Sequence, residues 1–297
     1  MAITLITGTS TGIGLATALH FARKGHDVYA TMRNPASGSG ALKDAAQAEG
    51  LTINVSQLDV DDPASIDRAV RDVLADAGRI DVLVNNAGIG DLGVVEKTND
   101  DIAKAIFETN FFGPLRLIRA VLPGMRERQS GAIVNVSSVA GQISGAGMSL
   151  YSATKHAIEA LSLSLAVEVT QFGIRVAVIE PGFIATPIIG KAVAVIPTDD
   201  DSPYADLERR LLTLYSQAMQ IGADPSIVAE VIEHAATTSE PKFRYPVGVD
   251  ATAFIEGRRR MTDEEFIADL GGRMTDGEYW AKFAHRFPMP AEEPAAP

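Results

Sequence analysis

Short runs of apolar, β-branched residues alternate along this chain with longer stretches in which apolar residues recur three and four positions apart. The short runs are typical of buried strands, and they lie at residues 2–7, 27–31, 52–59, 80–86, 132–138 and 174–180. The longer stretches predict helices at residues 14–25, 64–78, 99–128 and 150–171. Near-continuous apolar strands joined by helices indicate a mostly parallel sheet that is covered on both faces. We therefore predict an α/β fold of the doubly wound type.

The regular alternation ends after the sixth strand, and the remaining chain predicts helical additions. Two helices are expected at 204–220 and 225–237, and an edge strand at 243–248, because Pro246 would break the hydrogen bonding of a central strand. The predicted organisation is one domain over 1–250 with a substrate lid at about 183–222, a helical extension of that domain over 251–286, and a disordered tail over 287–297.

Composition and charge exclude several classes of function. The net charge of −12 disfavours nucleic acid as a partner, because a protein that neutralises phosphates needs a basic face. The absence of cysteine excludes disulfides and thiolate catalysis, and no histidine pair has metal-ligand spacing, so no metal site is expected. No apolar stretch approaches the ~18 residues of a membrane span, and we expect a cytoplasmic protein.

Three glycines follow the first predicted strand and open the first predicted helix. Gly8, Gly12 and Gly14 lie in the stretch TGTSTGIG. In a doubly wound sheet this turn is where a dinucleotide pyrophosphate meets the amides at a helix N-terminus. A purely structural glycine turn is the alternative, although the required strand and helix are both present.

The end of the second strand indicates which nicotinamide cofactor would bind. An acid at this point binds the ribose 2′-hydroxyl of NAD(H), whereas an arginine accepts the 2′-phosphate of NADP(H). Asp27 begins the strand, and Arg33 follows its end. The sequence therefore favours NADP(H) over NAD(H). Asp59, after the third strand, is a candidate contact to the adenine edge or a simple turn residue.

Tyr151 and Lys155 are four residues apart at the start of a predicted helix, which places them on one helical face. An ammonium beside a phenol favours the phenolate, the form that can accept a proton. Taken alone, this spacing is a weak signal.

Six motifs together resemble the short-chain dehydrogenase/reductase family, in its single-domain Rossmann subgroup and the branch of steroid- and retinol-type dehydrogenases. They are TGTSTGIG (7–14), NNAG (85–88), Asn110, NVSS (135–138), YSATK (151–155) and PGFIAT (181–186). The resemblance spans residues 2 to about 190, and Ser138 precedes Tyr151 by the thirteen residues that the family requires.

The resemblance implies a role for each matching position. Tyr151 would be the general acid/base, Lys155 its partner and a ligand of the nicotinamide ribose, Ser138 the hydroxyl that holds the substrate oxygen, and Asn110 the organiser of a water relay. The implied cofactor contacts are Gly8, Ser10, Gly12, Ile13 and Gly14 to the pyrophosphate, Asn86, Ala87 and Gly88 to the adenosine side, and Pro181, Gly182 and Thr186 to the nicotinamide.

The segment 182–200 is apolar and has no arginine, which favours a small, apolar alcohol or ketone as the substrate. We therefore expect an NADP(H)-dependent dehydrogenase or reductase that acts on CH–OH and C=O groups. The alternatives are a non-catalytic NADP(H)-binding regulator, and an epimerase or dehydratase on the same fold. Apolar residues on more than one face of 99–128 and 150–171, together with the resemblance, favour a homodimer or homotetramer.

Overall fold

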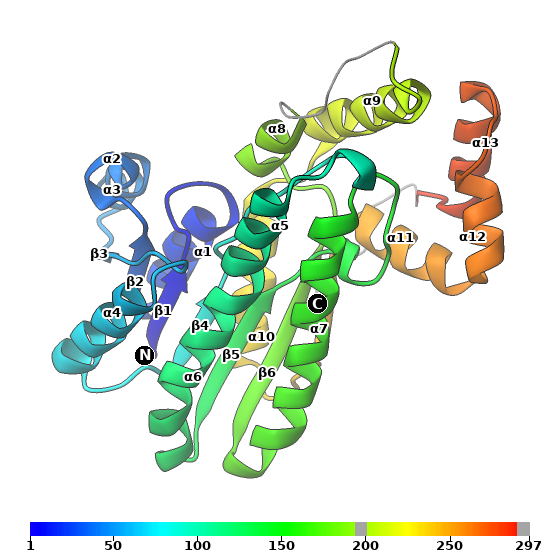
Figure 1. The fold of residues 1–297 in the computed structure, drawn as a ribbon. Helices are drawn as coiled ribbons and strands as arrows, with labels where there is room; N and C mark the ends of the chain where they lie inside the picture. The colour runs from blue at the N-terminus through cyan, green and yellow to red at the C-terminus, as the bar shows by residue number, and fades with distance from the viewer. Residues whose placement is uncertain (194–200, 290–297) are drawn as a thin grey trace.

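The computed structural model describes residues 1–193 and 201–289, and a central parallel sheet organises the described chain (Figure 1). Its strand order is β3-β2-β1-β4-β5-β6-β7, and every neighbouring pair is parallel. The strands are β1 (Ile3–Thr7), β2 (Asp27–Met32), β3 (Asn54–Gln57), β4 (Val82–Asn85), β5 (Gly131–Val136), β6 (Ile174–Pro181) and β7 (Arg244–Val247). The prediction of a doubly wound α/β fold is confirmed.

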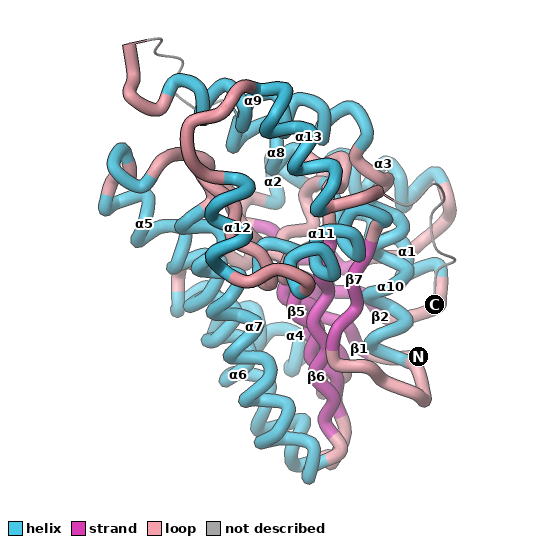
Figure 2. Tube along the Cα trace, turned by 90° about the vertical axis from the view of Figure 1, so that its right-hand side faces the viewer, coloured by secondary structure: helices cyan, strands magenta, loops and turns pink. Residues whose placement is uncertain are grey.

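Helices cover both faces of the sheet (Figures 1 and 2). The helices are α1 (Gly12–Arg23), α2 (Pro35–Gly38), α3 (Gly40–Ala48), α4 (Pro63–Ala77), α5 (Asp100–Phe107), α6 (Gly113–Glu127), α7 (Ser149–Val169), α8 (Pro187–Val193), α9 (Ala205–Ile221), α10 (Pro225–Thr237), α11 (Val249–Arg259), α12 (Asp263–Leu270) and α13 (Asp276–Arg286). Side chains of α1, α3 and α10 form one apolar core with the sheet, and those of α4, α6 and α7 form a second. Successive strand residues point to opposite faces, so Leu5 joins one core and Ile6 the other.

Two predicted elements differ from the structure. The predicted helix at 99–128 is two helices, because a π-helical turn at Glu108–Phe112 lies between α5 and α6. The predicted strand at 52–59 pairs only over Asn54–Gln57, at one edge of the sheet. β7 forms the other edge of the sheet. Pro246 has no backbone N–H to donate, and at this exposed edge it does not interrupt the pairing of a central strand.

The C-terminal helices lie beyond the carboxyl ends of the strands, where α8, α9 and α11 to α13 gather in Figure 1. Phe287 is buried against Phe254, with ring centroids 5.4 Å apart. The disordered tail predicted at 287–297 therefore includes a residue, Phe287, that packs against the rest of the protein. Residues 290–297 of that tail, and 194–200 of the expected lid, lie outside the described residues.

The parallel topology brings distant parts of the sequence to one edge of the sheet. The carboxyl ends of β1, β4, β5 and β6 are Thr7, Asn85, Val136 and Pro181. The loops that follow these strands carry the predicted glycine turn, the NNAG motif, the serine pair and the PGFIAT motif. In open α/β sheets, ligands bind in the crevice at this edge.

Candidate active site

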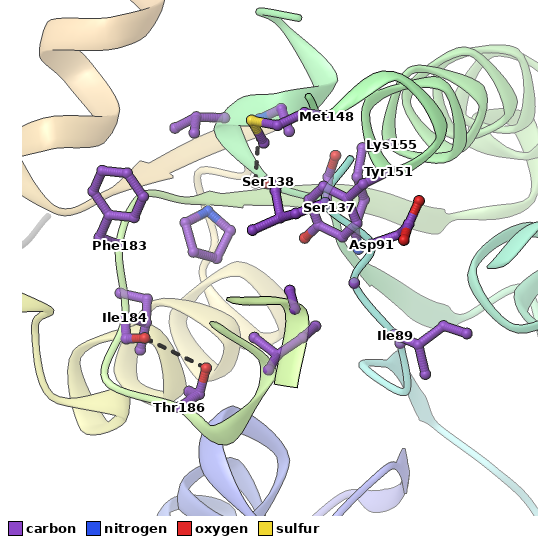
Figure 3. Close-up of a pocket in the computed structure, with 18 of the residues that line it drawn as sticks. Ile89, Asp91, Ser137, Ser138, Met148, Tyr151, Lys155, Phe183, Ile184 and Thr186 are labelled. Carbon is purple, nitrogen blue, oxygen red and sulfur yellow. Dashed lines mark hydrogen bonds between the residues drawn. The ribbon is translucent and has the colours of Figure 1, made fainter. Parts of the chain in front are cut away.

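A cavity of about 620 Å³ lies at the carboxyl edge of the sheet (Figure 3). It is lined by Gly8, Ser10, Gly12, Ile13, Gly14, Arg33, Asp59, Asn86, Ala87, Gly88, Ser138, Tyr151, Lys155, Pro181, Gly182 and Thr186. The structure thus brings these residues, which come from seven separate stretches of the chain, around one space. Asn110 does not line the cavity and lies behind it.

The glycine turn has a geometry that only glycine allows. Gly8 and Gly12 have φ angles of 71° and 57°, in the left-handed region. A Cβ on Gly14 would lie 2.3 Å from the carbonyl oxygen of Gly8 and 2.4 Å from Nδ2 of Asn86. The bare backbone leaves the N-terminus of α1 open to the cavity, as a pyrophosphate group requires.

The two asparagines of NNAG have different partners. The Asn86 side chain donates to the carbonyl oxygens of Thr7 (2.8 Å) and Gly8 (3.2 Å), so it holds the glycine turn in place as well as lining the cavity. Asn85 donates to Oδ1 of Asn135 (2.8 Å), and Asn135 donates to Ser162 (2.8 Å), inside the core.

The two charged side chains at the ends of β2, Asp27 and Arg33, lie at different places relative to the cavity. Asp27 accepts a hydrogen bond from Asn54 (2.9 Å) at the start of the strand and does not line the cavity. Arg33 is exposed at its rim, just after the strand ends. Asp59 also lines the cavity, and its Oδ1 accepts from the backbone N–H of Asp61 (3.1 Å), so it is also a turn residue.

Tyr151 and Lys155 project from the first two turns of α7 toward the cavity (Figure 3). The Lys155 ammonium lies 5.5 Å from the centroid of the Tyr151 ring and donates to the carbonyl oxygen of Val136 (2.9 Å), at the end of β5. Ser138 lies two residues beyond that strand, and its Oγ accepts from the backbone N–H of Ala140 (3.1 Å). Strand β5 therefore positions both the lysine and the serine.

Burial determines the protonation of this pair. It raises the pKa of Tyr151 to about 12, and a hydrogen bond from Ser138 acts in the opposite direction. It also lowers the pKa of Lys155 to about 8, against the favourable field of Glu159. The expected lowering of the tyrosine pKa is therefore not achieved by the protein alone, because desolvation of the phenolate outweighs the nearby ammonium.

Asn110 occupies the π-helical turn, a feature that is frequent at functional sites. It donates to the carbonyl oxygen of Ile89 (2.9 Å) and to Oγ1 of Thr154 (3.1 Å), and it accepts from the N–H of Ile89 (2.9 Å). Thr154 in turn donates to the carbonyl oxygen of Tyr151 (2.8 Å). Asn110 thus joins the loop after β4 to the N-terminal end of α7. Thr154 was not predicted from the sequence, because the chemical signal of YSATK lies in Tyr151 and Lys155.

The half of the cavity away from the glycine turn has apolar walls. They include Met148, Phe183, Leu211, Leu214 and Tyr215. The C-terminal helices complete them with Phe254, Phe266, Ile267, Leu270, Tyr279, Phe283 and Phe287. The segment 251–286 therefore forms part of the cavity wall. Its signal in the sequence was the four-residue spacing of Tyr279, Phe283 and Phe287, which places the first two rings on one face of α13 and the third directly after that helix ends.

A buried charged cluster lies behind Lys155. Arg244 contacts Glu159 (3.0 Å) and Glu180 (3.3 Å), and both carboxyl groups are almost fully buried. Burial, together with the neighbouring Glu159, raises the pKa of Glu180 to about 7. No sequence motif pointed to this cluster, since its members come from α7, β6 and β7.

The remaining expectations concern metals and membranes. Within 1–193 and 201–289, no group of three or more His, Asp or Glu side chains is arranged to hold a metal ion. None of the helices in the same ranges is long and apolar enough to cross a membrane.

The basic run at Arg258–Arg260 is neutralised locally, because Arg258 pairs with Asp263 and Arg260 with Glu256.

The fold and the cavity together define a dinucleotide-binding protein of the doubly wound class. The family model for short chain dehydrogenases matches residues 2–195. The chain is 34% identical to 3-ketodihydrosphingosine reductase of Bacteroides thetaiotaomicron over 83% of its length and 87% of that protein. It is 35% identical to human retinol dehydrogenase 8, over 81% of its length and 79% of that protein.

Solved structures of similar proteins support the same family. A short-chain dehydrogenase from Streptomyces avermitilis superposes with a TM-score of 0.75 at 37% identity, covering 96% of this chain and 97% of that one. Levodione reductase gives 0.73 at 27% identity, covering 85% and 98%. The chain belongs to the short-chain dehydrogenase family, whose members are oxidoreductases that use NAD(H) or NADP(H).

Proposed function

We propose that this protein is an NADP(H)-dependent oxidoreductase that interconverts a ketone or aldehyde and an alcohol on a lipophilic substrate. One observation carries the proposal. Tyr151, Lys155 and Ser138 line one cavity together with the glycine turn and with apolar side chains of the C-terminal helices. Two relatives are named for retinol and 3-ketodihydrosphingosine, a lipid alcohol and a lipid ketone, and this supports the lipophilic character of the substrate.

The cofactor site follows from the shape of the loops. The glycine turn at Gly8–Gly14 holds the pyrophosphate, Ala87 and Gly88 flank the adenosine side with Asp59, and Pro181 to Thr186 flank the nicotinamide. Arg33 binds the 2′-phosphate, which gives the preference for NADP(H). When bound, NADP(H) supplies or accepts the hydride.

Side chains of the protein carry out the proton transfer. Ser138 holds the substrate oxygen and Tyr151 donates a proton to it as negative charge develops there. A phenol with a raised pKa is protonated near neutral pH, which suits the reductive direction. In the oxidative direction Tyr151 must act as phenolate, and Lys155 stabilises that form. Asn110 organises the path by which the proton is replaced, through the loop it shares with α7.

Exposed apolar residues on α7 and the preceding π-helical turn support a homo-oligomer. Val167 is 72% exposed, Leu163 48% and Phe112 41%. An isologous contact between two copies would bury these side chains. A Val167→Glu variant should lower the molar mass measured by light scattering, whereas an unchanged mass would place the contact elsewhere.

A substrate panel tests the function. Long-chain ketones and secondary alcohols are assayed with NADPH, NADH and their oxidised forms, by the absorbance of the reduced nicotinamide. The proposal predicts turnover of apolar substrates and faster rates with the phosphorylated cofactor. Tight NADPH binding with no turnover of any substrate would instead support the non-catalytic regulator.

A further inference from the structure

Asp91 places a carboxyl group in the wall of the cavity, where Figure 3 shows it on the same side as Tyr151 and Lys155. Its loop passes between the lid and α7. A Cβ on Gly90 would lie 3.4 Å from Cγ1 of Ile188 in α8, and the N–H of Gly93 donates to the carbonyl oxygen of Gly147 (2.8 Å), just before α7. The loop therefore runs past the catalytic end of that helix.

The surroundings of Asp91 are apolar. Leu92, the next residue, is buried in a cluster with Ala192, Leu211 and Tyr215, and Met148 packs against that cluster. These side chains belong to the lid helices and to the loop before α7. Asp91 is thus a charged group set into the wall of a lipophilic pocket.

The protein gives this carboxyl little compensation. It receives a hydrogen bond from the backbone N–H of Leu92, and burial nonetheless raises its pKa. Within the described ranges, no side chain forms an ion pair or a hydrogen bond with it. Asp91 is half-buried, so the carboxylate loses part of its hydration, and a donor or a cation that binds it in the cavity would offset that loss.

The other acids of the cavity differ from Asp91. Asp61 accepts a hydrogen bond from Oγ1 of Thr109 (2.8 Å), and Asp59 accepts from the N–H of Asp61. Both follow β3, on the side of the glycine turn. Among the acids that line the cavity, Asp91 is therefore the one whose carboxyl group is available to contact a substrate.

We propose that Asp91 binds a protonated amine of the substrate, so that the preferred substrates are lipophilic amino ketones and amino alcohols. This inference rests on the function proposed above and names its substrate class. An ammonium forms a charge-assisted hydrogen bond with a carboxylate, which is roughly twice as strong as a bond between two neutral groups, and opposite charges add an attraction that a neutral hydroxyl lacks. The net charge of −12 also raises the local concentration of cations.

The test compares long-chain ketones that differ at one position. One set carries a primary amine two, three or four bonds from the carbonyl carbon, and the matched sets carry a methyl or a hydroxyl group instead. The ratio of kcat/KM for the amine to that for the methyl compound is measured at pH 7 for each variant, so that differences in folding cancel.

The wild type should prefer the best amine at least tenfold over its methyl counterpart. Asp91→Asn should lower this ratio at least tenfold, which corresponds to about 1.4 kcal/mol. Asp91→Glu, which keeps the charge, should restore most of the preference, and Asp100→Asn, an exposed substitution outside the cavity, should leave it intact. An unchanged ratio in Asp91→Asn, or a wild-type preference for the hydroxyl ketone, would overturn the proposal.

A binding measurement separates this inference from the proposed function. Decylamine and decanol are titrated into the protein in the presence of NADP⁺ and followed by calorimetry. If no ketone or alcohol in any panel is turned over, the proposed function fails, and the titration still decides the role of Asp91. Selective weakening of decylamine binding by Asp91→Asn, at least tenfold relative to decanol, supports the inference. Equal effects on both ligands refute it.

Discussion

Replacing Lys155 with methionine removes the positive charge beside Tyr151 while keeping most of the side-chain volume. The ammonium lies 5.5 Å from the centre of the tyrosine ring and is 7% exposed. At an effective dielectric constant of about 20, a unit charge at that distance stabilises the phenolate by about 3 kcal/mol. Since one pKa unit is about 1.4 kcal/mol, the loss should raise the working pKa of Tyr151 by about two units.

The assay is alcohol oxidation, because this direction needs the phenolate. The kcat of the wild type and of Lys155→Met is measured from pH 6 to 10 with saturating NADP⁺. The rise of kcat with pH should move about two units toward alkaline pH, and kcat at pH 7 should fall roughly 100-fold. Lys24→Met, an exposed lysine outside the cavity, is the matched control.

The sign of the pH dependence gives a second check on the same variant. The pKa of Lys155 is lowered to about 8, so its charge is present at pH 7 and is lost as the pH rises through that value. The ratio of wild-type to variant kcat should therefore be largest below pH 8 and shrink above it. A profile that does not move, or a ratio that is constant across this range, would refute the electrostatic role of the lysine.

Three further predictions concern the cofactor site and the cluster behind the lysine. Arg33→Asp should lower the ratio of kcat/KM with NADPH to that with NADH at least tenfold, measured on one ketone. Gly14→Ala should weaken cofactor binding at least tenfold in a fluorescence titration, because its Cβ would lie 2.3 Å from the Gly8 carbonyl oxygen. The raised pKa of Glu180 gives stability that is present below about pH 4.5 and is lost as the pH rises through about 7. Glu180→Gln should therefore gain in Tm relative to the wild type between pH 5 and pH 8, and a constant Tm difference would contradict this.

The sheet and the cofactor turn were predictable because each depends on local sequence. Apolar runs bounded by turns give strands, and three glycines between a strand and a helix give the turn. Tyr151 and Lys155 were predictable for the same reason, since four-residue spacing fixes a helical face. These features need no knowledge of which elements pack together.

Features that depend on tertiary packing escaped prediction. The π-helical turn that holds Asn110 reads as continuous helix in the sequence. The different partners of Asn85, which ends β4, and Asn86, which follows it, depend on the strands and loops that pack beside them. The docking of α13 on the cavity requires contacts between residues far apart in sequence, such as Phe254 with Phe287. Helical periodicity predicts that α13 exists but not where it packs.

The central claim is that Tyr151 transfers the proton at the substrate oxygen. Tyr151→Phe removes the hydroxyl and keeps the ring, and general acid catalysis of this kind contributes typically 10²–10⁴-fold. For a ketone that the wild type reduces, kcat should fall by at least 100-fold, while the dissociation constant for NADPH in a fluorescence titration should change less than threefold. A variant that retains more than a tenth of the wild-type kcat would contradict the account.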